Sequence, residues 1–324
     1  MNRLRKKDGG REEGLEIDLV YTWVNGSDPV WREKRDRTIG CPIEKSAENC
    51  EGRYVDNDEL MFSLRSVEKY APWIRRIFIV TDNQVPSWLD TSNSKIKIVD
   101  HSEILPAEVL PTFNSVVIEH ALHKIPGLAE YFLYANDDMF FNRLVRPKDF
   151  VTPEGFPVIR LIRRPLRRII LKFKKLILRG KISYYNDTIK RAADLIASKF
   201  GRWIGSKPHH NIDAYCKSLY RETAETFIKE IQPTLSNHQR KENDIQRIIY
   251  SYYPIVKKRC RVEYVGRKTS FRLRNHRRKY YSKMTKLNPM LFCLNDSQYA
   301  TDEDRRLGRE FLKTIFPNPS SFEK

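Results

Sequence analysis

Short apolar runs that end in polar clusters recur along this chain, and they predict buried strands that lead into loops. The first run is β-branched and aromatic, IDLVYTWV, and it stops at a turn cluster, NGSDP. The later runs are equally short and also end in polar residues. The predicted strands are residues 17–24, 77–81, 96–100, 131–134 and 292–294.

Segments with helical spacing lie between these runs. Residues 58–71 place Leu60, Leu64 and Val67 on one face, and Pro72 ends the segment. Strands that alternate with helices predict an α/β, Rossmann-like fold, with a mainly parallel sheet and helices on both faces. The length of 324 residues suits one large domain, or one domain with an insertion. The other predicted helices are residues 114–124, 160–181, 214–231, 242–253 and 301–315.

The composition indicates a globular protein, with 40% hydrophobic and 31% charged residues. No apolar run reaches about 18 residues, the length that a membrane-spanning helix needs. The N-terminus is polar and no apolar signal core follows it, so we expect a disordered leader over residues 1–14 and a cytoplasmic location. Five cysteines without a CxxC pair fit reduced thiols, which argues against a Cys41–Cys50 disulfide.

The net charge of +19 predicts an anionic partner. Residues 160–181 hold ten Lys or Arg and no acid, with apolar residues at helical spacing. This pattern is typical of a basic amphipathic helix, which either lies on an anionic membrane face or packs on the domain with its charges solvated. Residues 257–283 are also basic, but neither segment interleaves the aromatic residues of an RNA-stacking surface. Nucleic-acid binding is therefore disfavoured.

Asn136-Asp137-Asp138 is the sharpest local motif. It follows an apolar strand, and in parallel α/β sheets ligands bind beyond the carboxyl ends of the strands. Two carboxylates at such an end can bind Mg²⁺ or Mn²⁺ and so neutralise a diphosphate, although a solvated turn would have the same residues. The strand over residues 292–294 ends in a second Asn-Asp pair, Asn295-Asp296.

Other candidates each have an ordinary structural alternative. Asp56 or Asn57 can cap the helix that follows, and Arg65 can be a phosphate ligand or a surface charge. His209 and His210, close to Asp213, can include a general base or be structural. Arg240 suits a phosphate clamp or a solvated helix start. No GxGxxG or GxxxxGK[ST] loop is present, which disfavours a kinase or a dinucleotide oxidoreductase.

Four blocks of this sequence resemble the conserved regions of the Stealth proteins, which are capsule and exopolysaccharide phosphotransferases related to the catalytic subunit that makes the mannose-6-phosphate mark. The first block is IDLVYTWVNGSDP, and the second runs from DNDELMFSLRSVEKYAPW to FLYANDDMFF. The third, HHNID and HQRKENDIQ, is looser, and the fourth is FCLND with FPNPSSFE. The blocks occupy residues 17–29, 56–141, 209–246 and 292–323.

The resemblance implies a glycosyltransferase-like fold and transfer of hexose 1-phosphate, or N-acetylhexosamine 1-phosphate, from a nucleoside diphosphate sugar to a glycan hydroxyl. The product would be a phosphodiester-linked capsular, exo- or lipopolysaccharide, made with a lipid-linked or free glycan acceptor. An alternative is a metal-dependent glycosyltransferase that releases the nucleoside diphosphate. The implied organisation is a nucleotide-sugar half over 15–141, a basic helical insertion over 142–205, and a C-terminal catalytic half over 206–324.

The resemblance also implies roles for individual residues. Asp137 and Asp138 would organise the cation, with Asp138 and Asp296 as its ligands. His210, favoured over His209 because of its spacing to Asp213, would take the acceptor proton, and Arg240 would stabilise developing phosphoryl charge. The implied donor-site residues are Trp23, Asn25, Gly26, Asp28, Arg53, Asp58, Arg65 and Asn295.

Overall fold

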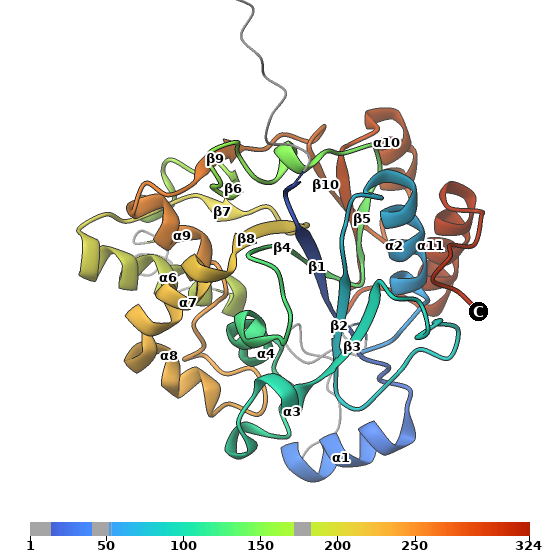
Figure 1. Cartoon of the computed structure of the whole chain (residues 1–324), viewed down its shortest axis with the longest axis horizontal. Coiled ribbons are helices and arrows are strands. Elements are labelled where there is room, and N and C mark those ends of the chain that lie inside the picture. The colour runs from blue at the N-terminus through green and yellow to red at the C-terminus, as the bar shows by residue number, and fades with distance from the viewer. Residues whose placement is uncertain (1–13, 41–51, 53, 172–182) are drawn as a thin grey trace, which may run out of the picture.

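A five-stranded sheet in the order β3-β2-β1-β4-β8 forms the centre of the computed structural model, which describes residues 14–40, 52, 54–171 and 183–324 (Figure 1). Four strands are parallel, and β8 pairs antiparallel with β4 at one edge. Because β1 lies between β2 and β4, the strand order reverses there, which is the topological switch point of the sheet. The strands are β1 (Ile17–Thr22), β2 (Ile77–Thr81), β3 (Ile96–Asp100), β4 (Tyr131–Asn136) and β8 (Asp213–Cys216).

Helices from both halves of the chain cover one face of this sheet. Val20, Phe78 and Phe132 alternate toward this face and join a buried cluster with Ile189 of α6 and Ile249 of α9. Figure 1 shows these helices together on one side of the sheet. They are α4 (Ser115–Ala121), α6 (Tyr184–Phe200), α7 (Lys217–Thr226), α8 (Ile228–Leu235) and α9 (Ile249–Val256).

The opposite face packs on α2 (Glu59–Tyr70), where Leu60 and Leu64 meet Leu19 and Leu133 of the sheet. Behind α2 lies a second sheet, in the order β10-β11-β5, with its own apolar cluster. The predicted α/β fold with helices on both faces is therefore confirmed. The second layer contains β5 (Met139–Phe141), β10 (Ser270–Arg274), β11 (Leu291–Asn295), α10 (Lys279–Leu287) and α11 (Asp302–Ile315).

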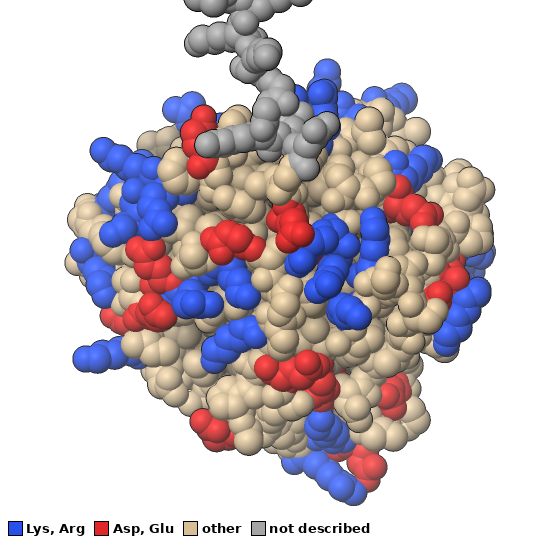
Figure 2. Space-filling model, in the orientation of Figure 1, with Lys and Arg blue, Asp and Glu red and all other residues tan. Residues whose placement is uncertain are grey.

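A third sheet has the order β7-β6-β9. Lys and Arg side chains gather over α9 and β9, at the upper left of Figure 2, and acidic residues are interspersed elsewhere on that face. The strands of this sheet are β6 (Val158–Ile162), β7 (Lys207–Pro208) and β9 (Arg261–Tyr264). The remaining helical elements lie elsewhere in the chain and are α1 (Pro29–Ile39), α3 (His101–Ile104), and the 3₁₀ turns η3 (Ala107–Val109), η4 (Leu122–Lys124) and η5 (Pro147–Asp149).

The helix predicted over residues 160–181 is wrong at its start, because residues up to Ile162 belong to β6. Val158, Ile159 and Leu161 are buried there, and the Arg160 guanidinium lies 4.9 Å from the centre of the Phe150 ring. Residues 167–171 are helical, and the prediction for residues 172–182 lies outside the described residues. The same is true of Cys41, Cys50 and nearly all of the predicted leader.

Two other helix boundaries also differ from the prediction. The segment 214–231 begins as strand β8, because its backbone pairs with β4 before helix α7 starts. The segment 242–253 becomes helical only at Ile249, because the Asp244 carboxylate accepts from the Lys241 amide at 3.1 Å and forms a turn there. The segment 142–205, predicted as a basic helical insertion, contributes β6 to a sheet and α6 to the main core.

Candidate active site

The ends of β1 and β4 bring two of the predicted motifs to one edge of the sheet. Thr22, the last residue of β1, is in register with Asn136, the last residue of β4. The turn over residues 23–28 and the acidic pair at 137–138 therefore leave the sheet side by side, at its switch point. This is the position where α/β sheets bind ligands.

The turn after β1 is fixed by hydrogen bonds on both sides. Asp28 caps α1, accepting from the Val30 amide at 2.9 Å, and its second oxygen accepts from Gln84 at 2.9 Å. Gln84 also bonds the backbone of Asn25 in both directions, at 3.0 Å each. Gly26 is required by space, because a Cβ there would lie 2.5 Å from the Tyr54 carbonyl oxygen. The turn is thus rigid before any ligand binds.

Four acidic side chains lie close to one another beyond β4. Burial raises the pKa of Asp56 to about 6, of Glu59 to about 7 and of Asp138 to about 6. Burial and the charges of its acidic neighbours raise the pKa of Asp137 well above its usual range. Burial and mutual repulsion oppose ionisation of these carboxylates. A cation bound among them would offset both effects and stabilise the ionised form.

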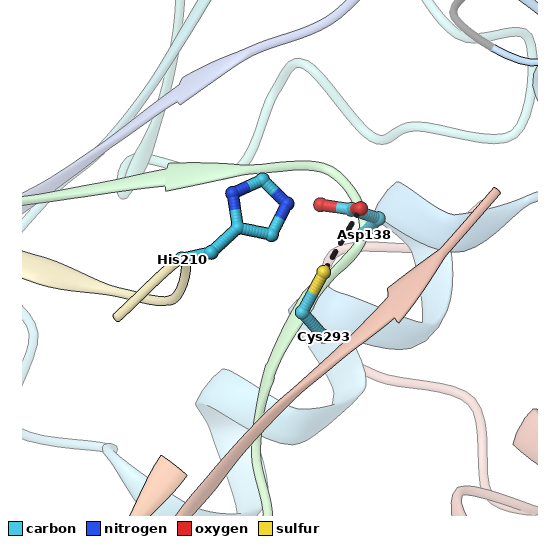
Figure 3. Close-up of side chains that lie close together, drawn as sticks. All are labelled: Asp138, His210 and Cys293. Carbon is cyan, nitrogen blue, oxygen red and sulfur yellow. Dashed lines mark hydrogen bonds between the residues drawn. The ribbon is translucent and has the colours of Figure 1, made fainter. Parts of the chain in front are cut away.

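Asp138, His210 and Cys293 converge from three separate elements, as Figure 3 shows. One ligand atom from each lies within 4.8 Å of the other two, and the Cys293 thiol donates to Asp138 Oδ2 at 3.1 Å. Within the described part of the chain, Asp138 Oδ1 and His210 Nε2 are buried and have no hydrogen-bond partner. Buried polar atoms are normally satisfied, so these two indicate a missing ligand.

The two adjacent histidines have different environments. His209 has both ring nitrogens in contact, with Ser270 Oγ at 3.1 Å and Asp213 Oδ1 at 3.0 Å. His210 has a left-handed backbone, φ 55°, and its ring faces Asp138. Burial lowers the pKa of His210 to about 3, so its imidazole is neutral at physiological pH. These contacts suit His209 to a structural role, whereas the unpartnered Nε2 of His210 is free to contact a ligand.

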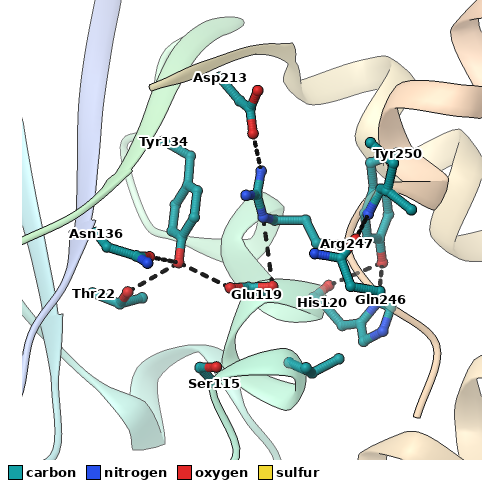
Figure 4. Close-up of polar contacts among 12 residues, drawn as sticks. Thr22, Ser115, Glu119, His120, Tyr134, Asn136, Asp213, Gln246, Arg247 and Tyr250 are labelled. Carbon is teal, nitrogen blue, oxygen red and sulfur yellow. Dashed lines mark hydrogen bonds and ion pairs between the residues drawn. The ribbon is translucent and has the colours of Figure 1, made fainter. Parts of the chain in front are cut away.

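A buried network surrounds Arg247 (Figure 4). Its guanidinium donates to Asp213 at 2.8 Å, pairs with Glu119 at 3.5 Å and lies 4.4 Å from the centre of the Tyr134 ring. The Tyr134 hydroxyl lies 3.1 Å from Glu119 Oε1 and 3.0 Å from Thr22 Oγ1. The network therefore joins the end of β1 to the Asp213–His209 pair.

Arg240 lies at the start of α4, where it donates to Ser115 Oγ at 2.7 Å. Its charge also acts on Glu119. Burial raises the pKa of Glu119, and the charges of Arg247 and Arg240 partly offset this rise. Arg240 is only partly buried, so its guanidinium has access to an incoming anion. A helix N-terminus beside an arginine favours negative charge.

The Asn295-Asp296 pair lies at the end of β11. Arg272 Nε donates to Asn295 Oδ1 at 2.9 Å, and the Arg272 charge also acts on Asp138 and His210. Asp296 is already engaged, because Oδ2 accepts from Arg305 at 2.8 Å and Oδ1 accepts from the Ser297 amide. The structure therefore groups Asp138 with His210 and Cys293 rather than with Asp296.

Two of the residues predicted to bind the donor have other partners. Arg65 forms a two-pronged contact with Glu323, at 2.9 and 2.6 Å, and donates to the Phe316 carbonyl. These contacts hold the C-terminal segment against α2, and the predicted substrate role of Arg65 stays a prediction. Asp58 pairs with Arg309 of α11. Arg53 lies outside the described residues.

The predicted cap of α2 is also different. Asp58 occupies the N-cap position with a left-handed backbone, φ 65°, and its side chain makes no capping bond. Asp56 instead accepts from the Asp58 amide at 2.9 Å, and Asn57 donates to Glu59. Asp56 and Glu59 thereby lie with Asp137 and Asp138 in the acidic cluster.

The residues that the sequence prediction missed are Glu59, Glu119, Arg247, Arg272 and Cys293. Each is a single charged or thiol side chain, four of them in ordinary helices or strands and Arg247 in a turn, and the site residue that each one acts on comes from another element. Arg247 and Asp213, for example, are 34 residues apart. Only Cys293 had a local signal, because it precedes the Asn-Asp pair after β11.

The observed donor atoms test the predicted divalent cation. The unpartnered Asp138 Oδ1 fits a hard cation, because Mg²⁺ binds carboxylate oxygens. Burial raises the pKa of the Cys293 thiol well above its usual range, so it acts toward such a cation as a hydrogen-bond donor to Asp138. Asp138 therefore fits Mg²⁺ or Mn²⁺, and Cys293 does not.

Buried carboxylates and an imidazole at the switch point of an α/β sheet are typical of an enzyme active site. Three conserved regions of the Stealth proteins match this chain: region 1 over residues 16–40, region 2 over 53–159 and region 4 over 272–324. The chain belongs to the Stealth family. The third block noted in the sequence, residues 209–246, lies between the matches to regions 2 and 4.

Several curated relatives have similar sequences. A capsular polysaccharide phosphotransferase of Haemophilus influenzae is 33% identical, over 89% of this chain and 80% of its own length. An exopolysaccharide phosphotransferase of Nocardia farcinica is 34% identical over 96% of this chain, which spans 62% of that relative. One from Lactiplantibacillus plantarum is 28% identical over 96% of this chain and 97% of its own length. Among solved structures, the galactosyltransferase LgtC aligns over 94% of this chain and 96% of its own, with 11% identity and a TM-score of 0.46.

Proposed function

We propose that this enzyme transfers a hexose 1-phosphate or N-acetylhexosamine 1-phosphate from a nucleoside diphosphate sugar to a glycan hydroxyl. The product is a phosphodiester-linked capsular, exo- or lipopolysaccharide. Family membership and the phosphotransferase names of the relatives support this reaction. The observation that carries it is the facing pair of unpartnered atoms, Asp138 Oδ1 and His210 Nε2, at the switch point of the sheet.

In the proposed reaction the acceptor oxygen attacks the β-phosphorus of the donor. The new oxygen–phosphorus bond forms as the bond from the β-phosphorus to the bridging oxygen of the diphosphate breaks, and the nucleoside monophosphate leaves. The acceptor proton goes to His210 Nε2, which has no hydrogen-bond partner in the described part of the chain. Phosphoryl transfer of this kind depends mainly on positioning and on neutralisation of charge.

Asp138 would hold the divalent cation, Mg²⁺ or Mn²⁺, with Asp137 beside it. When bound, the cation would neutralise the diphosphate and assist departure of the monophosphate. Asp296, also predicted as a ligand, would have to exchange Arg305 for the cation. Arg240 would stabilise charge on the phosphoryl oxygens from the start of α4.

The proposed donor site extends over the turn after β1. Its rigid backbone, fixed by Gln84 and Tyr54, presents the turn without the entropy cost of ordering a loop. Asn295 would complete the site from β11, and Arg53 and Asp58 would adjoin it. The turn residues in this proposal are Trp23, Asn25, Gly26 and Asp28.

A panel of nucleotide sugars, each incubated with the enzyme, Mg²⁺ and a capsular or exopolysaccharide acceptor, tests this proposal. We expect one donor to yield the nucleoside monophosphate, in equal amount to the phosphodiester formed. His210→Gln should lower this yield roughly 10²–10⁴-fold, the usual contribution of a general base. Replacing Ser297, a neighbour of the site without a proposed role, with alanine is the matched control. Release of the nucleoside diphosphate would instead support an ordinary glycosyltransferase.

A peripheral contact with an anionic membrane is a second proposal. None of the helices in the described part of the chain has both the length and the hydrophobicity to span a bilayer. Leu166, Ile169 and Ile170 are nevertheless 60%, 65% and 51% exposed, beside the exposed Arg163 and Arg164. Apolar side chains flanked by arginines suit the surface of an anionic bilayer.

Flotation with anionic vesicles tests the membrane contact. The triple variant Leu166→Ser, Ile169→Ser, Ile170→Ser should float at least several-fold less than the unmodified chain, because the inserted apolar area is lost. A matched variant, Leu144→Ser with Ile228→Ser, removes exposed apolar side chains elsewhere and should float normally. Equal flotation of both variants would show that this segment does not insert.

A further inference from the structure

We propose that Asp138, His210 and Cys293 form a binding site for Zn²⁺, or a transition-metal ion of similar chemistry. It shares Asp138 with the proposed Mg²⁺ or Mn²⁺ site and adds a nitrogen and a sulfur ligand, so the enzyme with zinc bound is a different state from the one that carries out the proposed transfer. The three side chains offer one oxygen, one nitrogen and one sulfur, all within 4.8 Å of one another. This donor set is unsuited to Mg²⁺, which takes oxygen ligands in octahedral geometry. It matches Zn²⁺, which is bound by carboxylate, imidazole and thiolate together.

The distances suit a tetrahedral ion. Bond lengths of about 2.0–2.3 Å from zinc to oxygen, nitrogen and sulfur place the ligand atoms about 3.3–3.6 Å apart. Asp138 Oδ2 and Cys293 Sγ are already 3.1 Å apart, so these two need to separate only slightly. His210 Nε2 points toward the pair and needs a small side-chain movement to reach the ion (Figure 3). A solvent molecule or a substrate oxygen would supply the fourth ligand, as in three-residue zinc sites.

The backbone holds these three residues in place. Cys293 is fully buried in β11, where it pairs with Met139 of β5, and the Leu294 amide donates to the Asp138 carbonyl at 2.8 Å. His210 follows His209, whose ring is held by Asp213 and Ser270. Fixed ligands on three elements lower the entropy cost of binding an ion.

Binding of the ion releases one proton from the protein. The Cys293 thiol gives its proton to solvent, and the thiolate takes the ion in place of its hydrogen bond to Asp138. His210 coordinates as the neutral imidazole, through the unpartnered Nε2. Asp138 supplies the remaining negative charge. The bound site therefore satisfies His210 Nε2, which has no partner in the described structure.

Metal binding by the full chain, free of any polyhistidine tag and stripped with a chelator, tests the proposal. Zinc affinity is measured by competition with a chromophoric chelator, without donor or acceptor. We expect Cys293→Ser and His210→Gln each to weaken zinc binding at least about tenfold, since each removes one of three protein ligands. Cys260→Ser, which removes a half-buried thiol in another part of the fold, should leave the affinity unchanged.

Substitution with Co²⁺ gives a second readout, which is decisive in the unmodified chain even where a variant fails to fold. The unmodified chain should show a thiolate-to-cobalt charge-transfer band, absent in Cys293→Ser and retained in Cys260→Ser. Lack of the band in the unmodified chain, or equal zinc affinity in Cys293→Ser, would overturn the proposal. Because no sugar substrate is present, these results bear on the metal site alone, and failure of the proposed transfer reaction would leave them standing.

Discussion

Asp138→Asn should lower the rate of transfer roughly 10²–10³-fold or more, the usual loss when one preorganised electrostatic group is removed. Asparagine keeps the shape of the side chain but removes the charge that would hold the cation at Oδ1. The rate is measured as nucleoside monophosphate released at saturating Mg²⁺. Asp90→Asn, an exposed aspartate that accepts from Ser92, is the matched control and should keep full activity.

The same variant should raise the melting temperature of the metal-free chain at neutral pH. Burial raises the pKa of Asp138 from 3.8 to about 6, so the folded state binds a proton more tightly than the unfolded state. The charged carboxylate therefore opposes folding above about pH 6, and this penalty disappears as the pH falls toward 3.8. The gain in stability of Asp138→Asn over the unmodified chain should therefore shrink as the pH falls from about 6 to 3.8. Full activity together with unchanged stability in Asp138→Asn would contradict our account of this carboxylate.

Arg247→Met should destabilise the fold by about 3–5 kcal/mol, the usual cost of removing one partner from a buried ion pair. Methionine retains much of the side-chain volume but leaves Glu119 and Asp213 buried without their cation. Chemical denaturation followed by circular dichroism measures the free energy of unfolding. Arg259→Met, which breaks a half-exposed pair with Glu222, should cost no more than about 1 kcal/mol.

The cost of Arg247→Met should also depend on pH. Although burial opposes ionisation of Asp213, Arg247 and His209 lower its pKa to about 2. A lowered pKa means that this carboxylate stabilises the fold above its ordinary value of 3.8 and loses that contribution as the pH falls toward 2. The difference in unfolding free energy between the unmodified chain and Arg247→Met should therefore narrow below about pH 4. Equal destabilisation by Arg247→Met and Arg259→Met would show that the buried network does not stabilise the fold.

The central sheet could be predicted because its strands are short, almost wholly apolar and bounded by turn residues. This pattern reflects burial on both faces, which the structure confirms for β1 and β2. The prediction failed at β6, where Arg160 is buried against Phe150 and the neighbouring arginines gave the segment a helical, amphipathic appearance. A buried arginine has no local signature, because its partners come from other elements.

The candidate site could be predicted where chemistry and chain position coincide. Asp137 and Asp138 follow a strand end, and parallel strands bring such ends together. Arg247 and Cys293 could not be predicted in the same way, because their importance depends on contacts with Asp213 and Asp138 across the fold. Arg65 shows the opposite case, since its position in a conserved block suggested a ligand role but its partner is Glu323.

The fate of the β-phosphate tests the proposed reaction most directly. A nucleotide sugar carrying radioactive phosphorus only in its β-phosphate is incubated with the enzyme, Mg²⁺ and acceptor, and the polymer is separated from the nucleotides. Transfer of a sugar 1-phosphate predicts that the label moves into the polymer and that the released monophosphate is unlabelled. Label that stays with a released nucleoside diphosphate, while sugar enters the polymer, would contradict phosphotransfer and identify a glycosyltransferase.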